Sequence, residues 1–172
     1  IKVDCMTAYM ETHAIPVEIQ ERIRQYFEYE WQTLKGLHTH TILNILPYSL
    51  RETVQYHLYE SYVTKCGLFT DCDSNFIRLI TNSLHSMIIT PGKYVYESND
   101  TSPYMYFVTK GTLELIGNRK VLQMIHETNL FGECECIFEL PRQSSVRAIG
   151  FVELLSYSPN IHTLNLNTLS LG

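Results

Sequence analysis

The sequence predicts an α+β fold, in which an N-terminal helical segment is followed by a jelly-roll-like β-roll with flanking helices. Two observations predict it. Apolar residues recur every three or four positions in the first half of the chain, as in amphipathic helices. From about residue 86 the pattern changes to short β-rich runs separated by Gly, Asn and Pro turns, which is typical of sandwiches, barrels and jelly rolls. We expect the helical segment to cover residues 1–70 and the β-roll residues 71–172.

The first long helix is predicted to begin at Pro16, because the missing proline N–H costs nothing in a first turn. Its apolar positions recur at helical spacing as far as Trp31, and Gly36 predicts its end. The Tyr and Trp residues of this helix have two interpretations. They form either a face packed on neighbouring helices or a contact with another subunit.

A shorter apolar cluster from Ile42 to Leu46 ends at Pro47. The segment Ser49–Glu52 then has the capping-box form, in which the serine hydroxyl and the glutamate carboxylate each accept a backbone N–H. It predicts a helix whose buried stripe is Leu50, Val54 and Leu58.

The last predicted helix of the front half begins after Asp73, a favoured N-cap residue. The residues that we expect to face inward from it are Phe76, Ile77, Ile80 and Leu84. Short strands are predicted after residue 86 at 87–89, 94–96, 104–109, 112–116, 121–125, 145–149 and 152–157.

Composition excludes several classes of function. The net charge of −5 is unfavourable for nucleic-acid binding, and no apolar run is long enough for a membrane span. The N-terminus lacks the apolar core of a signal peptide, and the chain reads as a fragment of a longer protein. Five irregularly spaced cysteines do not form a disulfide framework. No nucleophile–base motif is present, so we expect a protein that is not an enzyme.

The segment from Phe131 to Arg142 carries the most chemical information. A strand ends at Phe131, Gly132 permits a sharp turn, and one or two helical turns follow, whose first N–H groups are available to an anion. Arg142 lies just before the next strand, so its guanidinium can return over the same turn, and arginine is suited to bidentate phosphate contact. Glu133 is an acceptor and fits hydroxyl donors, such as those of a sugar. Together they indicate a nucleotide.

Phe-Gly-Glu, then eight residues, Arg, and Val-x-Ala resemble the phosphate-binding cassette of cyclic-nucleotide-binding domains. The front half is similar to the C-linker of cyclic-nucleotide-gated, hyperpolarisation-activated and EAG-type cation channels. The residues carrying that similarity are Tyr26–Trp31, Gly36, Leu46-Pro47, Leu50-Arg51, Val54, His57-Leu58 and Leu68-Phe69. The sequence departs from the pattern at several points. The second position after the Glu is normally small and here is Glu135, and the loop before the Met105 strand, which usually carries glycines, has Asn99 and Ser102.

The resemblance implies that Glu133 holds the ribose hydroxyl and Arg142 the cyclic phosphate of cAMP or cGMP. It implies a ligand-binding set of Phe131, Gly132, Glu133, Cys134, Arg142, Gln143 and Ser144. The resemblance implies a tetrameric cation channel, from a superfamily that includes potassium channels. This module would lie at the cytoplasmic face of the plasma membrane. Its partners would be the cyclic nucleotide, the transmembrane pore domain of the same chain and the other subunits, with no nucleic acid.

Alternative interpretations stay open at this point. The domain is either a nucleotide sensor or a ligand-independent homology domain for subunit assembly or gating, and a soluble cyclic-nucleotide sensor without a pore is a third possibility. Glu133 and Arg142 also fit a surface ion pair. His38-x-His40 and Cys134-x-Cys136 lack a second pair at zinc spacing, so we expect no metal. Cys136 is expected to face the β-roll interior, and Cys66 and Cys72 to be packing residues.

Overall fold

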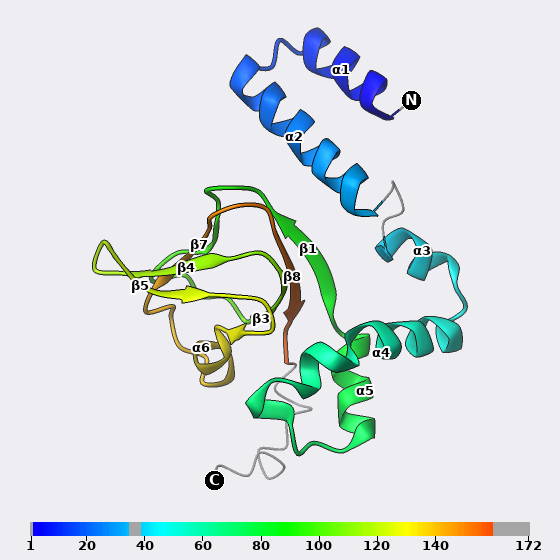
Figure 1. Cartoon of the computed structure of the whole chain (residues 1–172), viewed down its shortest axis with the longest axis vertical. Helices are drawn as coiled ribbons and strands as arrows, with labels where there is room; N and C mark the ends of the chain where they lie inside the picture. Colours follow the sequence, from blue (N-terminus) through cyan, green and yellow to red (C-terminus); the bar gives the residue numbers. More distant parts are fainter. Residues whose placement is uncertain (1, 35–38, 160–172) are drawn as a thin grey trace. The chain divides into compact units, whose positions relative to one another are not determined.

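A computed structural model describes residues 2–34 and 39–159 of the chain. The chain forms two compact units, Ile1–Ile42 and Leu43–Gly172, which we describe separately. The predicted boundary at residue 70 between linker and β-roll stays a prediction. The first unit contains helices α1 (Lys2–Thr12) and α2 (Val17–Leu34), and α3 (Thr39–Ile45) spans the division (Figure 1).

Helix α2 confirms the helix predicted after Pro16. The Pro16 carbonyl accepts the N–H groups of Ile19 and Gln20 at 2.9 and 3.0 Å, so the proline occupies the start of the first turn. The predicted stop at Gly36 lies outside the described residues.

The second unit begins with α4 (Tyr48–Thr64), the short 3₁₀ helix η1 (Gly67–Phe69) and α5 (Ser74–Asn82). Asp73 caps α5 as predicted, because its carboxylate accepts the N–H groups of Asn75 and Phe76 at 2.6 and 3.1 Å. Ile77, Ile80 and Leu84 are buried, as predicted, and Phe76 is half-buried.

Two predictions about α4 are wrong. The capping box is absent, since the helix starts at Tyr48 with Pro47 as its N-cap and without a side-chain cap. Leu50 and Leu58 are exposed, and the buried positions are Tyr59 and Val63. The helix has apolar residues on two faces, and tertiary packing selects the other one. Arg51 serves the end of α3 instead, donating from Nε to the Leu43 carbonyl at 2.8 Å.

Within the described residues eight strands follow: β1 (His85–Ile89), β2 (Tyr94–Tyr96), β3 (Met105–Lys110), β4 (Leu113–Gly117), β5 (Lys120–Ile125), β6 (Leu130–Phe131), β7 (Ser145–Ala148) and β8 (Val152–Tyr157). They form two antiparallel four-stranded sheets, ordered β1-β8-β3-β6 and β2-β7-β4-β5. Helix α6 (Glu133–Ile137) lies between β6 and β7 in the chain. The predicted α+β fold is confirmed.

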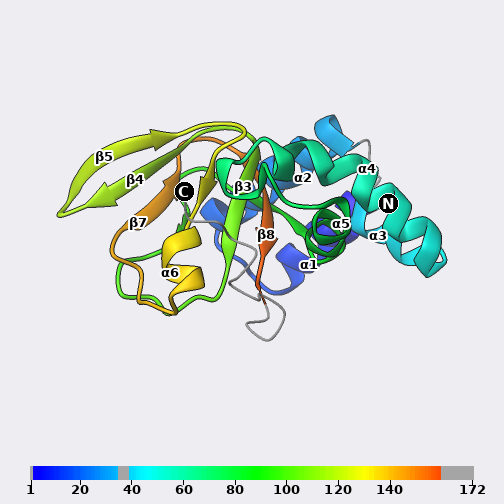
Figure 2. The same ribbon diagram turned by 90° about the horizontal axis from the view of Figure 1, so that it is seen from below.

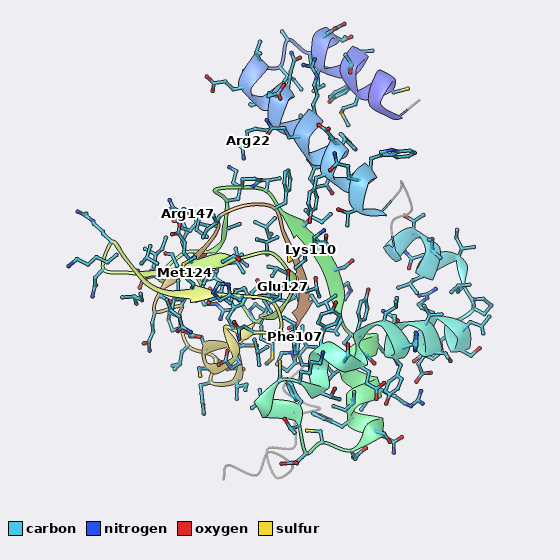
Figure 3. All side chains as sticks on the ribbon, in the orientation of Figure 1. Arg22, Phe107, Lys110, Met124, Glu127 and Arg147 are labelled. Carbon is cyan, nitrogen blue, oxygen red and sulfur yellow. The ribbon has the colours of Figure 1, made fainter. Side chains whose placement is uncertain are left out.

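The β4–β5 hairpin extends from one end of the roll, and helices α4 and α5 lie at the other end (Figure 2). Strand β3 is buried on both faces, because its side chains alternate and each face packs against a different core. Met105 and Phe107 join the core shared with α4, α5 and α6, whereas Tyr106 and Val108 join the core between the sheets. Phe107 in Figure 3 marks where the roll meets these helices. Strand β3 therefore links the two cores.

Candidate functional site

The turn at Gly132 is the point on which the site is built. Strand β6 ends at Phe131, Gly132 has φ +75°, and α6 starts at Glu133, which confirms the predicted turn. A left-handed φ is costly for residues that carry a Cβ. A Cβ at this position would also lie 2.6 Å from Nη1 of Arg142. The sequence needs glycine here because the turn is left-handed and the arginine packs directly against it.

Arg142 returns over this turn, as predicted. Its Nη1 donates to the carbonyl oxygen of Gly132 at 2.8 Å, and its Nη2 donates to the carbonyl oxygens of Ser102, at 3.1 Å, and Tyr104. The Arg142 side chain is fully buried, and its Nε–H has no partner in the structure. The guanidinium is therefore held by acceptors from two segments of the protein, and its Nε–H makes no hydrogen bond.

Two features around Arg142 were not predicted from the sequence. The guanidinium carbon lies 4.2 Å from the centre of the Tyr96 ring, within cation–π range. The main chain of Arg142 is also fixed, because the Asn99 N–H donates to its carbonyl at 2.7 Å and its own N–H donates to the backbone carbonyl of Asp100 at 2.9 Å. The loop between β2 and β3 thus encloses the arginine. An aromatic residue at the end of a predicted strand is too common a feature to indicate this role.

Phe131 lies next to this cluster and is buried. Its ring stacks on Tyr106 with centroids 5.2 Å apart and lies 6.0 Å from the ring of Tyr96. Burial raises the pKa of Tyr96 and of Tyr106, with Arg142 acting in the opposite direction. Phe131, Gly132 and Arg142 are consequently brought together as the sequence predicted.

Glu133 lies in the wall of a separate cavity of about 680 Å³ next to η1 and α6. The other residues of this wall are mostly apolar: Lys65, Cys66, Gly67, Leu68, Thr128, Asn129, Leu130, Cys134, Ile137 and Phe138. The pKa of the Cys66 thiol is raised to about 11, by burial and by the negative charge of Glu133. Glu133 thus contributes to a largely apolar cavity whose lining does not include Arg142.

The remaining residues of the predicted ligand-binding set are Cys134, Gln143 and Ser144, and each has a different environment. Cys134 is exposed, with Sγ 3.9 Å from Oε1 of Glu133. Cys136 is buried and donates its thiol to the Pro103 carbonyl at 3.1 Å, but it packs in the core shared with the helices and not, as predicted, in the interior of the β-roll. Gln143 lies in the wall of another cavity, of about 570 Å³, on the outer face of the β2–β7–β4–β5 sheet. Ser144 is half-buried in the bend before β7.

This arrangement suits the binding of an anion more than the making or breaking of covalent bonds. Its buried cation is Arg142, and the groups nearest to it are carbonyls, the Tyr96 ring and the Glu135 carboxylate. Throughout residues 2–34 and 39–159, no group of three or more His, Cys, Asp or Glu side chains is placed to hold a metal ion.

Comparison with protein families matches residues 87–161 to the cyclic nucleotide-binding domain. The β-roll of this chain is therefore similar to the cyclic nucleotide-binding domain family. The match covers β3, the Gly132 turn and the return of Arg142, so the family and the site geometry agree on the same segment.

Several ion channels are similar to most of the chain. Human voltage-gated inwardly rectifying potassium channel KCNH3 is 31% identical over 150 residues, 87% of this chain and 13% of that protein. Human cyclic nucleotide-gated channel beta-3 is 28% identical over 159 residues, 89% of this chain and 20% of that protein. A cyclic nucleotide-gated channel of Caenorhabditis elegans is 24% identical over 165 residues, 91% of this chain and 22% of that protein. The predicted resemblance to these channels is confirmed.

The chain spans less than a quarter of the length of these relatives. None of the described helices is both long and apolar enough to cross a membrane. The similarity therefore extends to the cyclic nucleotide-binding domain and the helices that precede it, and the activity of a whole channel is considered below as a proposal.

Proposed function

We propose that this chain is the cytosolic gating module of a tetrameric cation channel, and that its cassette binds cAMP or cGMP. The observation that carries the proposal is the 2.8 Å contact between Arg142 Nη1 and the Gly132 carbonyl. It brings the arginine suited to phosphate onto the turn that precedes Glu133, the residue suited to ribose hydroxyls. The function is regulatory and not enzymatic, in keeping with the channels to which the chain is similar.

Nucleotide binding at this cassette requires a local rearrangement. Arg142 is fully buried and donates to carbonyls of its own chain. To reach a phosphate, its guanidinium has to exchange at least one of these acceptors for a phosphate oxygen, and Glu133 has to face the same ligand. We infer that Phe131, Gly132, Cys134, Gln143 and Ser144 line the opened cassette.

Helix α6 provides a route from the cassette to the helices. Cys136 belongs to the core cluster that contains Val63 of α4, Phe69 of η1 and Ile80 of α5, and Ile137 packs against the same cluster. A shift of α6 on ligand binding therefore changes the packing of α4 and α5. The ligand biases gating to the extent that it binds one of the two packings more tightly.

The helical segment is proposed to contact the pore domain and other subunits. Helix α2 exposes large apolar side chains, with Trp31 65% and Val17 76% exposed. Exposed apolar residues on one helix are typical of an interaction surface. In this proposal the helical segment lies at the cytoplasmic face of the plasma membrane.

Titration calorimetry of the 172-residue chain with cAMP and with cGMP tests nucleotide binding. We expect binding in the micromolar range for one or both ligands, weakened at least about tenfold in Glu133→Gln and in Arg142→Lys. Glu133→Gln keeps the size of the side chain and Arg142→Lys keeps its charge, and circular dichroism checks that both variants fold. No heat at millimolar ligand in the folded wild-type chain would refute the proposal.

The second candidate is a ligand-independent homology domain that serves subunit assembly or gating. The observation that favours it is the complete burial of Arg142 among acceptors of its own chain. Under this proposal neither nucleotide gives heat, and analytical ultracentrifugation of the chain shows concentration-dependent self-association. Replacing exposed Trp31 by Ala should then weaken self-association, whereas Arg142→Lys should leave it unchanged.

A further inference from the structure

Arg142 carries a full positive charge inside the protein. Its guanidinium is completely buried, and the carbonyls of Gly132, Ser102 and Tyr104 supply dipoles but no negative charge. A buried charge needs an opposite charge as well as hydrogen bonds, because the protein interior replaces little of the lost hydration.

The opposite charge comes from Glu135 in α6. Its Oε2 lies 3.7 Å from Nη1 of Arg142, and its side chain is itself only 17% exposed. Two residues before it, Glu133 lies in the wall of a separate cavity with Cys66 and Leu68. Glu135 is thus the acid of the cassette that stands beside the phosphate-binding guanidinium.

We propose that Glu135 is a built-in anion which competes with the phosphate of a cyclic nucleotide for Arg142 and so keeps the affinity of the cassette low. This inference rests on the proposed function, that the cassette binds cAMP or cGMP. A phosphate that replaces Glu135 at Nη1 brings two negative groups to the same side of one guanidinium. It must either displace the carboxylate or bind against its repulsion.

Removing the charge of Glu135 therefore strengthens nucleotide binding. The test compares Glu135→Gln, which removes the charge at nearly constant size, with Glu135→Asp, which keeps it. The matched control is Glu139→Gln, which removes an exposed charge from the same cassette. Titration calorimetry with cAMP and cGMP should show at least about tenfold tighter binding by Glu135→Gln, and Glu135→Asp and Glu139→Gln within about threefold of the wild type.

A measurement without nucleotide tests the contact itself. Glu135→Gln leaves the buried Arg142 without an opposite charge. The urea midpoint of this variant should therefore fall below those of the wild type and of Glu139→Gln. A purely structural Glu135 would give the same loss of stability but would weaken nucleotide binding, because the cassette would be disturbed. The combination of lower stability and tighter binding is specific to competition.

The outcomes separate this inference from the function on which it rests. If the wild type binds nucleotide and Glu135→Gln binds no more tightly, the competition is refuted and the proposed function stands. If no heat appears with the wild type or with any folded variant, the proposed function is refuted, and the competition with it. If Glu139→Gln tightens binding as much as Glu135→Gln, the effect is one of general charge, and the specific role of Glu135 is refuted.

Discussion

The guanidinium carbon of Arg142 lies over the ring of Tyr96, 4.2 Å from the ring centre. Both side chains are buried, although 45 residues lie between them in the sequence. The ring covers one face of the guanidinium, while the carbonyls of Gly132 and Ser102 accept its N–H groups. Tyr96 is therefore part of the structure that fixes the cassette arginine.

We predict that Tyr96→Leu destabilises the protein much more than Tyr96→Phe. The leucine loses aromatic packing and the cation–π contact, at a cost of about 2–3 kcal/mol. The phenylalanine keeps the ring over Arg142, and we expect a loss of at most about 1 kcal/mol. Urea unfolding followed by circular dichroism measures both. Equal losses in the two variants would show that the ring over Arg142 contributes nothing.

A second prediction concerns Gly132→Ala. The left-handed φ of +75° costs alanine about 1–2 kcal/mol, and its Cβ would lie 2.6 Å from Nη1 of Arg142. We expect the free energy of unfolding to fall by at least about 2 kcal/mol. Gly150→Ala is the control, because its Cβ would meet nothing within 4 Å, and it should change stability by at most about 0.5 kcal/mol. Similar losses at both sites would contradict this account of the turn.

Much of the fold was predictable because it depends on local signals. Asp73 caps α5, alternating Leu113 and Leu115 belong to a strand, and Gly132 marks the turn before α6. Each of these residues acts on backbone within a few positions of itself. The convergence of Arg142 on Gly132 was also predictable, since a short segment between two strands has to return to the same region.

The environment of Arg142 was not predictable, because its partners are distant in the chain. The carbonyl oxygens of Ser102 and Tyr104 lie 40 and 38 positions away, and backbone carbonyls carry no sequence signature. The buried face of α4 escaped prediction for a similar reason. Apolar spacing allows either Leu50 and Leu58 or Tyr59 and Val63 to be inside, and only the position of the β-roll decides between them.

The third prediction tests the N-cap of α5. The Asp73 carboxylate accepts two backbone N–H groups, at 2.6 and 3.1 Å, so Asp73→Ala should cost about 1 kcal/mol of stability. Asp71→Ala removes a neighbouring exposed carboxylate and serves as the control, with an expected change within about 0.5 kcal/mol. Thermal and urea unfolding measure both. If Asp73→Asn destabilises as much as Asp73→Ala, charge and not capping is responsible.

The fourth prediction concerns alkaline pH. Burial raises the pKa of Tyr96, Tyr106 and Tyr157 above the value of about 10 that they have in the unfolded chain. The folded protein thus holds these protons more tightly than the unfolded chain does. The resulting stability is fully present below about pH 10 and is lost as the pH rises through the folded-state values.

Urea unfolding at several pH values between about pH 8 and about pH 11 measures this loss. The thiols of Cys66 and Cys136, with pKa values of about 11, act in the same direction. Tyr106→Phe removes one of the phenols, so its stability should fall less steeply with pH than that of the wild type. An equal slope in the variant would show that Tyr106 titrates as it does in the unfolded chain.

The fifth prediction is an order of thiol reactivity. Cys66 and Cys136 are buried, and burial raises the pKa of each to about 11, so at neutral pH only about one thiol in ten thousand is the reactive thiolate. Cys5 and Cys134 are exposed. Brief treatment with iodoacetamide, followed by peptide mass spectrometry, should label Cys5 and Cys134 first and the two buried cysteines only after denaturation.

The same measurement also reports on the cassette. Partial burial and the charges of Glu133 and Glu135 raise the pKa of Cys134. Glu135→Gln should therefore speed the labelling of Cys134, because one of the negative charges that oppose its thiolate is gone. Labelling of Cys5, which belongs to the other unit, should keep its rate and is the internal control. Rapid labelling of Cys136 in the folded wild type would contradict its burial between α6 and the core and, with it, the proposed route from the cassette to the helices.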